Sequence, residues 1–147
     1  MRTRRLQDFP LRIGNAVLCE DIRVEYGGKH SLLGVYAGDI IVPELKNFLK
    51  VALFIELYAK ELGEFDLEGK IIYADSDVLG FKLQMKYEDV KSPALLVSPS
   101  FPVPLNLEGE ILVMGTCKGK TSPLLSKTVR VGDVPSGLVA PNPTASP

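Results

Sequence analysis

The sequence contains no tryptophan, one histidine and two cysteines among its 147 residues. Cys19 and Cys117 lie about a hundred residues apart and lack the short, paired spacing that zinc sites and redox motifs require. We therefore expect two reduced thiols buried in strands, with a disulfide across the core as the alternative in an oxidising compartment. No cofactor motif is indicated, and a chain of this length needs no metal or disulfide to fold.

An excess of one charge and long hydrophobic runs are also missing. Seventeen basic and eighteen acidic residues give a net charge of -1, which provides no sequence-wide attraction for nucleic acid or an anionic membrane. The run from Val51 to Leu57 is interrupted by Glu56 and is too short to span a bilayer as a helix. Leu6 to Pro10 interrupts any apolar core of a signal peptide. We expect a cytoplasmic protein that binds neither nucleic acid nor membrane.

The clearest positive feature is a strand, a glycine turn and a second strand between Val17 and Val42. Apolar and charged residues alternate from Ile22 to Tyr26, as in a strand with one face on a core and one in water. Gly27 and Gly28 then supply the positive φ angles that a tight hairpin needs. The same alternation predicts two further hairpins, 65–73 with 81–87 and 105–117 with 124–131.

These patterns predict an all-β fold, an antiparallel β-sandwich of about eight strands, in which two sheets bury their apolar faces against each other. We expect the sandwich to occupy residues 15–132, after a basic arm over 1–14 and before a proline-rich tail over 133–147. The tail is too poor in apolar residues to order itself and should be flexible in isolation. Both ends carry candidate interaction residues, namely Arg2, Arg4 and Arg5 in the arm and Leu138 and Val139 in the tail.

The segment 44–62 is ambiguous. Lys50 to Tyr58 has the composition of a buried strand, but the apolar residues also follow a helical stripe that ends at Gly63. We favour a short helical turn after Pro43 followed by a strand, with one continuous helix as the alternative. The proline-rich stretch 92–104 should be a connector that holds one short strand, either at a sheet edge or in an irregular crossing.

The run CEDIRVEYGGKHSLLGVYAGDIIVP, from Cys19 to Pro43, resembles the opening of a family of short bacterial all-β proteins that is catalogued as a domain of unknown function. In that family an aliphatic strand ending in an acidic pair leads through a glycine turn into an S-L-x-G-V-Y-like strand. The resemblance implies a β-rich bacterial domain, and it implies no activity, ligand or catalytic residue.

Three residues are candidates for chemistry. His30 is the one histidine, so any histidine base must be this residue. Its possible acidic partners, Glu20 and Asp21, should lie at the end of the hairpin far from the turn. We therefore interpret His30 as a solvated turn residue. Asp75 and Asp77 have the spacing of two calcium ligands, but the other ligands of the loop pattern are absent, so an acidic turn is the better interpretation.

Five tyrosines lie in or beside predicted strands, where we expect them to pack in the core or at its rim: Tyr26, Tyr36, Tyr58, Tyr73 and Tyr87. No catalytic set of residues emerges. The sequence therefore favours a non-enzymatic protein-interaction or assembly module, for example a subunit of a larger particle such as a phage component. The first alternative is a sandwich that binds a small molecule or carbohydrate, and the second is a hydrolase that depends on His30.

Overall fold

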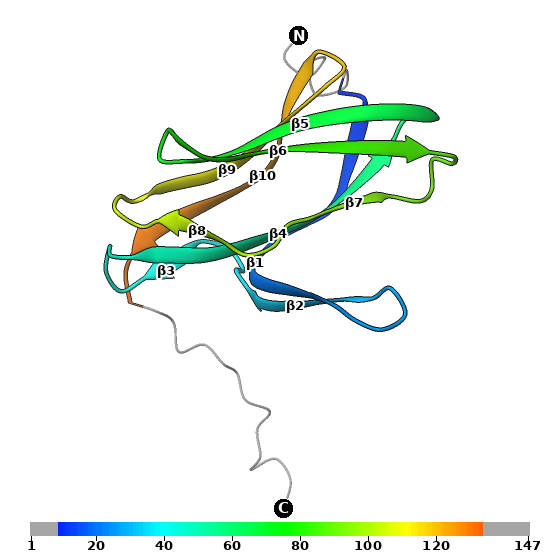
Figure 1. Ribbon diagram of the computed structural model, residues 1–147. Coiled ribbons are helices and arrows are strands. Elements are labelled where there is room, and N and C mark those ends of the chain that lie inside the picture. Colours follow the sequence, from blue (N-terminus) through cyan, green and yellow to red (C-terminus); the bar gives the residue numbers. More distant parts are fainter. Residues whose placement is uncertain (1–8, 134–147) are drawn as a thin grey trace, which may run out of the picture.

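The computed structural model describes residues 9–133 and shows a β-sandwich, as predicted (Figure 1). The described residues form ten strands, two more than the eight expected, and no helix. The strands are β1 (Leu11–Val24), β2 (His30–Val35), β3 (Ile40–Val42), β4 (Phe48–Ala59), β5 (Gly63–Tyr73), β6 (Ser76–Tyr87), β7 (Ala94–Val97), β8 (Phe101–Pro104), β9 (Gly109–Cys117) and β10 (Lys120–Val131).

Two five-stranded sheets enclose the core. Sheet A has the order β2-β1-β4-β7, with β8 on the same side of β4 as β7, and sheet B has the order β3-β10-β9-β5-β6. Neighbouring strands are antiparallel except β3 and β10, which run parallel. The inward rows of the two sheets meet in a set of side chains with almost no exposed surface, including Leu53, Ile55, Leu57, Leu67, Ile71 and Val113. This alternation of inward apolar and outward polar residues is why the sequence folds as a sandwich.

Both predicted hairpins of sheet B are confirmed. β5 pairs with β6 and β9 pairs with β10, each through a two-residue turn. Ala74 and Asp75 have φ angles of 49° and 66°, and Lys118 and Gly119 have φ angles of 50° and 76°. Turns with two left-handed residues match the twist of the flanking strands, so they join long hairpins without splaying them.

The helical turn expected after Pro43 is wrong. Pro43 to Asn47 instead carry the chain from β3 in sheet B to β4 in sheet A. Asn47 has a φ of 61°, which interrupts any helical run, and its carbonyl accepts a hydrogen bond of 3.0 Å from the amide of Leu105. The strand that was predicted to follow is confirmed as β4. The proline-rich connector holds two short strands, β7 and β8, instead of the single strand predicted, and both lie at the sheet edge.

The sandwich also begins earlier than predicted. Residues 11–14, assigned from the sequence to the basic arm, form the start of β1, and Leu11 pairs with Ala59. Phe9 and Leu11 are buried, so their apolar side chains hold this segment in the core. Arg2, Arg4, Arg5, Leu138 and Val139 lie outside the described residues.

Candidate functional site

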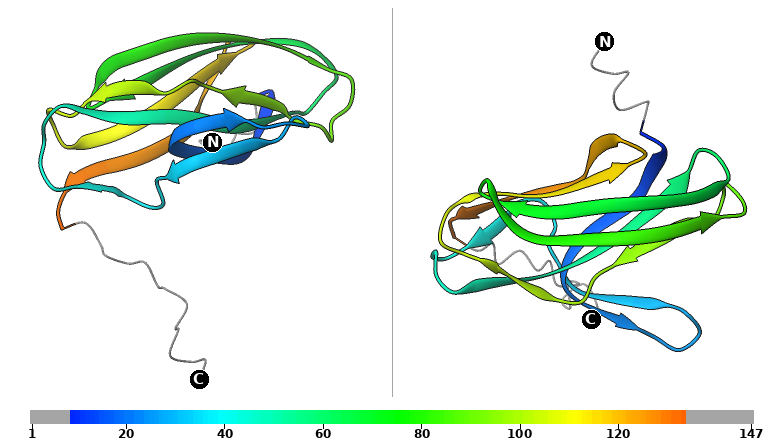
Figure 2. Two further views of the ribbon diagram at one scale, coloured as in Figure 1. Left: turned by 60° about the horizontal axis from the view of Figure 1, so that its bottom comes forward. Right: turned by 45° about the horizontal axis from the view of Figure 1, so that its top comes forward.

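The β1–β2 hairpin lies across the outer face of sheet A, and Cys19 marks the point where β1 changes direction. Cys19 pairs with Ala52 of β4 on one side and with Val35 of β2 on the other. Beyond Cys19 the hairpin leaves the edge of β4, and Figures 1 and 2 show it on the side of sheet A away from sheet B. Ala52 points away from the core yet is 0% exposed, because the crossing chain covers it.

Two contacts hold the hairpin in this position. The hydroxyl of Ser100, between β7 and β8, donates a hydrogen bond of 2.7 Å to the carbonyl of Glu20 and lies 3.1 Å from a carboxylate oxygen of Asp21. The ring of His30 meets the ring of Phe54 edge-on, with 5.6 Å between centroids. β7 and β8 lie on the opposite side of β4 from β1, so the hairpin spans the width of the central strand.

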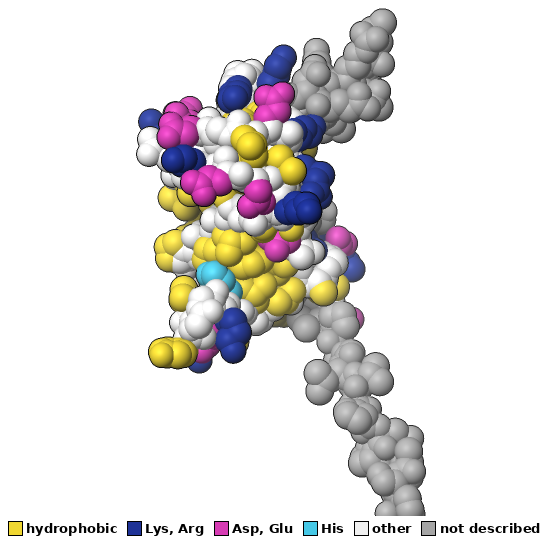
Figure 3. All heavy atoms as spheres, turned by 90° about the vertical axis from the view of Figure 1, so that its right-hand side faces the viewer, with side chains coloured by type: hydrophobic (Ala, Val, Ile, Leu, Met, Phe, Trp, Pro, Cys, Tyr) yellow, Lys and Arg dark blue, Asp and Glu magenta, His cyan; other side chains and the backbone are white. Residues whose placement is uncertain are grey.

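Apolar side chains gather where the hairpin and the sheet meet. Figure 3 shows a broad hydrophobic area beside the single histidine, with a further hydrophobic group at a projecting tip. Val24 is 72% exposed and Tyr26 is 99% exposed, next to the glycine turn. The interpretation of Tyr26 as a packing residue is therefore wrong, since the turn directs it into solvent. We call Val24, Tyr26, His30, Phe54 and Leu95 the hairpin surface.

Polar groups border this surface. Arg12 lies over the ring of Tyr58, with 4.4 Å from its guanidinium carbon to the ring centroid. Glu56 accepts a hydrogen bond of 2.9 Å from the amide of Asn15. An apolar centre with a polar rim is the usual composition of a protein interface.

The structure does not bring His30 together with the acidic pair. His30 pairs with Val24, whereas Asp21 pairs with Leu33, three register steps further from the turn. Among residues 9–133 the His30 ring makes its contact with Phe54 and no hydrogen bond or ion pair. The residues needed for a histidine base with a carboxylate partner are thus separated along the hairpin.

The two calcium candidates, Asp75 and Asp77, lie on either side of the residue that begins β6. Asp75 lies in the turn between β5 and β6, and Asp77 lies in β6, where its carboxylate is 4.0 Å from the ammonium of Lys70. Within the described part of the chain, no three histidine, cysteine, aspartate or glutamate side chains are close enough to hold a metal.

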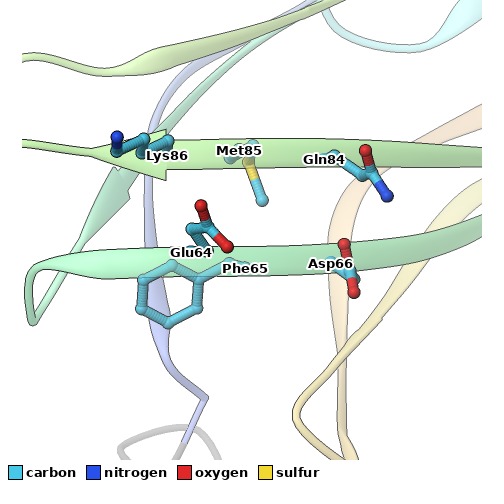
Figure 4. A pocket seen from close by; sticks show the side chains of 6 residues that line it. All are labelled: Glu64, Phe65, Asp66, Gln84, Met85 and Lys86. Atoms are coloured by element: carbon cyan, nitrogen blue, oxygen red, sulfur yellow. The ribbon is translucent and has the colours of Figure 1, made fainter.

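An open hollow runs along β5 and β6, and Figure 4 shows its six side chains on these two neighbouring strands. Glu64 is opposite Lys86, and further along the same pair of strands Lys82 lies 3.3 Å from Glu68. Phe65 and Met85, which alternate with the polar side chains, are buried. The hollow is a furrow over a strand pair on which opposite charges face each other, and its groups resemble those of an ordinary solvated sheet face.

Comparison with known proteins gives no family. No protein-family model matches the chain, and no curated protein matches it significantly. The resemblance of residues 19–43 to a bacterial family of unknown function stays a prediction. None of the described residues belongs to a helix of the length and hydrophobicity needed to cross a bilayer.

Two tyrosines, the partly buried Tyr36 and the buried Tyr87, donate hydrogen bonds to the backbone. The hydroxyl of Tyr36 lies 2.8 Å from the carbonyl of Lys50, and that of Tyr87 lies 2.7 Å from the carbonyl of Leu57. Burial raises the pKa of each from 10.0 to about 12. Each phenol therefore keeps its proton in the folded protein at a pH where the unfolded chain loses it.

We expect stability to fall at alkaline pH because of these two residues. A raised pKa in the folded state gives stability that is complete below pH 10 and is lost as pH rises toward about 12. Urea unfolding at a series of pH values should show this decline, and Tyr87→Phe should flatten it. The exposed Tyr26→Phe is the control, and equal slopes in the two variants would contradict the assignment.

Proposed function

We propose that this protein is a non-enzymatic assembly module that docks onto another protein, a second copy of itself first of all, through the hairpin surface. The observation that carries the proposal is the exposure of Val24 and Tyr26 at the tip of a hairpin that is itself anchored across sheet A. If the surface pairs with the same surface of a second copy, the product is a closed two-fold dimer, and if it docks onto a different patch of the next copy, rings or larger particles form.

The chemistry of the surface supports this function. Tyrosine is among the residues that contribute most to protein interfaces, because its rigid ring buries a large area and its hydroxyl can still find a partner. Phe54, whose ring meets that of His30, and Leu95, which is 38% exposed on the neighbouring β7, extend the apolar area from the hairpin onto the sheet. The hairpin is fixed at its base by Ser100 and at His30 by Phe54, so little conformational freedom remains to be lost on docking.

Removal of the two tip side chains should weaken assembly strongly. We expect the wild-type protein to form an oligomer, and Val24→Ser combined with Tyr26→Ser to raise its dissociation constant by about a thousandfold, since two interface hot spots of about 2 kcal/mol each amount to about 4 kcal/mol. Native mass spectrometry and light scattering over a concentration series measure this change.

Leu62→Ser is the matched control, because Leu62 is also exposed and apolar but lies between β4 and β5. It should assemble like the wild type. A wild-type chain that remains monomeric at high concentration would contradict self-assembly, and an equal loss in the control would show that the effect is not specific to the hairpin surface.

A further inference from the structure

A second apolar site lies at an open corner of the sandwich, away from the hairpin tip. It is a hollow with a volume of about 490 Å³ between the end of β2, strand β3 and the start of β4. Ile40, Val42 and Leu49 form a buried apolar floor, and Val35, at the rim, is 52% exposed. β3 has three residues and lies at the edge of sheet B, so only a short strand covers the core at this corner.

The chain enters its C-terminal segment beside this hollow. The amide of Gly132, directly after β10, donates a hydrogen bond of 3.0 Å to the carbonyl of Val42. A side chain added at Gly132 would lie 3.3 Å from a methyl carbon of Ile41. Residues 134–147 therefore begin at the edge of the hollow rather than at a distant part of the molecule.

The sequence of this segment suits the hollow. Apart from proline and alanine, its apolar residues are Val134, Leu138 and Val139, and it contains no charged residue. Pro135, Ser136 and Gly137 precede Leu138 and favour a chain reversal. Leu138 is the sixth residue after Gly132, and an extended chain of this length spans about 20 Å, which is enough to return to the corner beside Gly132.

The charges at the rim are already satisfied. Arg130 and Asp39 pair with each other, with 3.3 Å between the guanidinium nitrogen and the carboxylate oxygen. An uncharged aliphatic segment can therefore cover the hollow without leaving an unpaired charge beneath it. We propose that Leu138 and Val139 bind in this hollow of their own molecule.

Cysteine cross-linking tests the position of the segment. Leu138→Cys combined with Ala37→Cys, at the rim, should form a disulfide within one molecule under mild oxidation. The control pairs Leu138→Cys with Thr128→Cys, which is exposed on β10 about 13 Å along the strand from Gly132 and outside the hollow. Both cysteines are within reach of a free tether, so we expect cross-linking at Ala37 to be about tenfold faster only if the segment docks.

Hydrogen exchange gives an independent measurement. Leu138→Ser with Val139→Ser should speed amide exchange in Ile40–Val42 by about tenfold, whereas Thr144→Ala with Ser146→Ala should leave it unchanged. Equal cross-linking at Ala37 and Thr128, disulfides only between molecules, or unchanged exchange would each overturn the proposal. These outcomes are independent of the assembly test at the hairpin surface.

Discussion

Replacing Ile55 with alanine is expected to lower the free energy of unfolding by about 2–5 kcal/mol. Ile55 is 0% exposed in the middle of β4, the strand that pairs with β1 on one side and with β7 and β8 on the other. Its side chain points between the two sheets, so the substitution removes apolar contacts and leaves a cavity that the paired strands cannot close. Because domains of this kind are stable by about 5–15 kcal/mol, one such change removes a large share of the total.

Urea unfolding followed by circular dichroism measures this loss. Lys50→Ala is the matched control, since Lys50 lies on the same strand with its side chain exposed. Its effect should stay within about 0.5 kcal/mol. A loss below about 1 kcal/mol in Ile55→Ala would show that β4 does not organise the core as described.

The second large effect is expected at Ala52, where the hairpin crosses the sheet. Its methyl group is covered by the chain around Cys19, whose thiol lies 3.7 Å from the carbonyl of Ala52. A leucine here is too large for the space and should cost about 1–3 kcal/mol. The hairpin can move away from sheet A without disturbing the inner faces, so we expect Ala52→Leu to release the hairpin and to leave the sandwich folded.

Amide exchange resolved along the chain distinguishes release from general unfolding. In Ala52→Leu, residues 22–35 should exchange at least about tenfold faster, while β5 and β9 keep their protection. Ser126→Leu places the same side chain on the exposed face of sheet B and should change neither region. Equal acceleration in β5, β9 and the hairpin would mean that the hairpin and the sandwich form one cooperative unit.

Most of the individual strands could be predicted because their signals are local. Gly27 and Gly28 have φ angles of 84° and 78°, as the hairpin pattern required. The alternation in β5 and β6 also survives in detail, including Gly69, which faces the core and is covered by the ring of Phe81. Proline placed β7 and β8 at an edge for a simple reason, since it lacks the amide hydrogen that a central strand needs.

The direction change at Cys19 was not predictable from alternation. Period two shows which residues share a face of a strand, but it does not show that the strand leaves one partner and crosses another. Here the crossing depends on the small size of Ala52 and on Ser100, which are far from Cys19 in the sequence. The parallel pairing of β3 with β10 was missed for the same reason, because only the tertiary fold brings them together.

In the candidate site, too, the local features were predictable and the features that depend on the tertiary fold were not. The sequence placed His30 beside a turn and away from its acidic partners, and the register agrees. It did not identify Val24 and Tyr26, because their alternation with charged residues is also that of a half-buried strand. Both side chains are exposed because the hairpin tip projects beyond sheet A, and the tip projects there because the hairpin crosses β4.

The two cysteine thiols are buried in different parts of the molecule, one beneath the hairpin and one between the sheets. Cys19 lies under the corner of the hairpin, and Cys117 lies at the end of β9 in the core of the sandwich. Burial raises the pKa of both thiols, so neither reacts readily as a nucleophile while it is covered. We expect an alkylating reagent to reach Cys19 when the hairpin lifts from sheet A and to reach Cys117 when the two sheets separate. The rate of alkylation at Cys19 therefore reports local opening of the hairpin, and the rate at Cys117 reports global unfolding. Mass spectrometry can measure both rates in one labelling reaction.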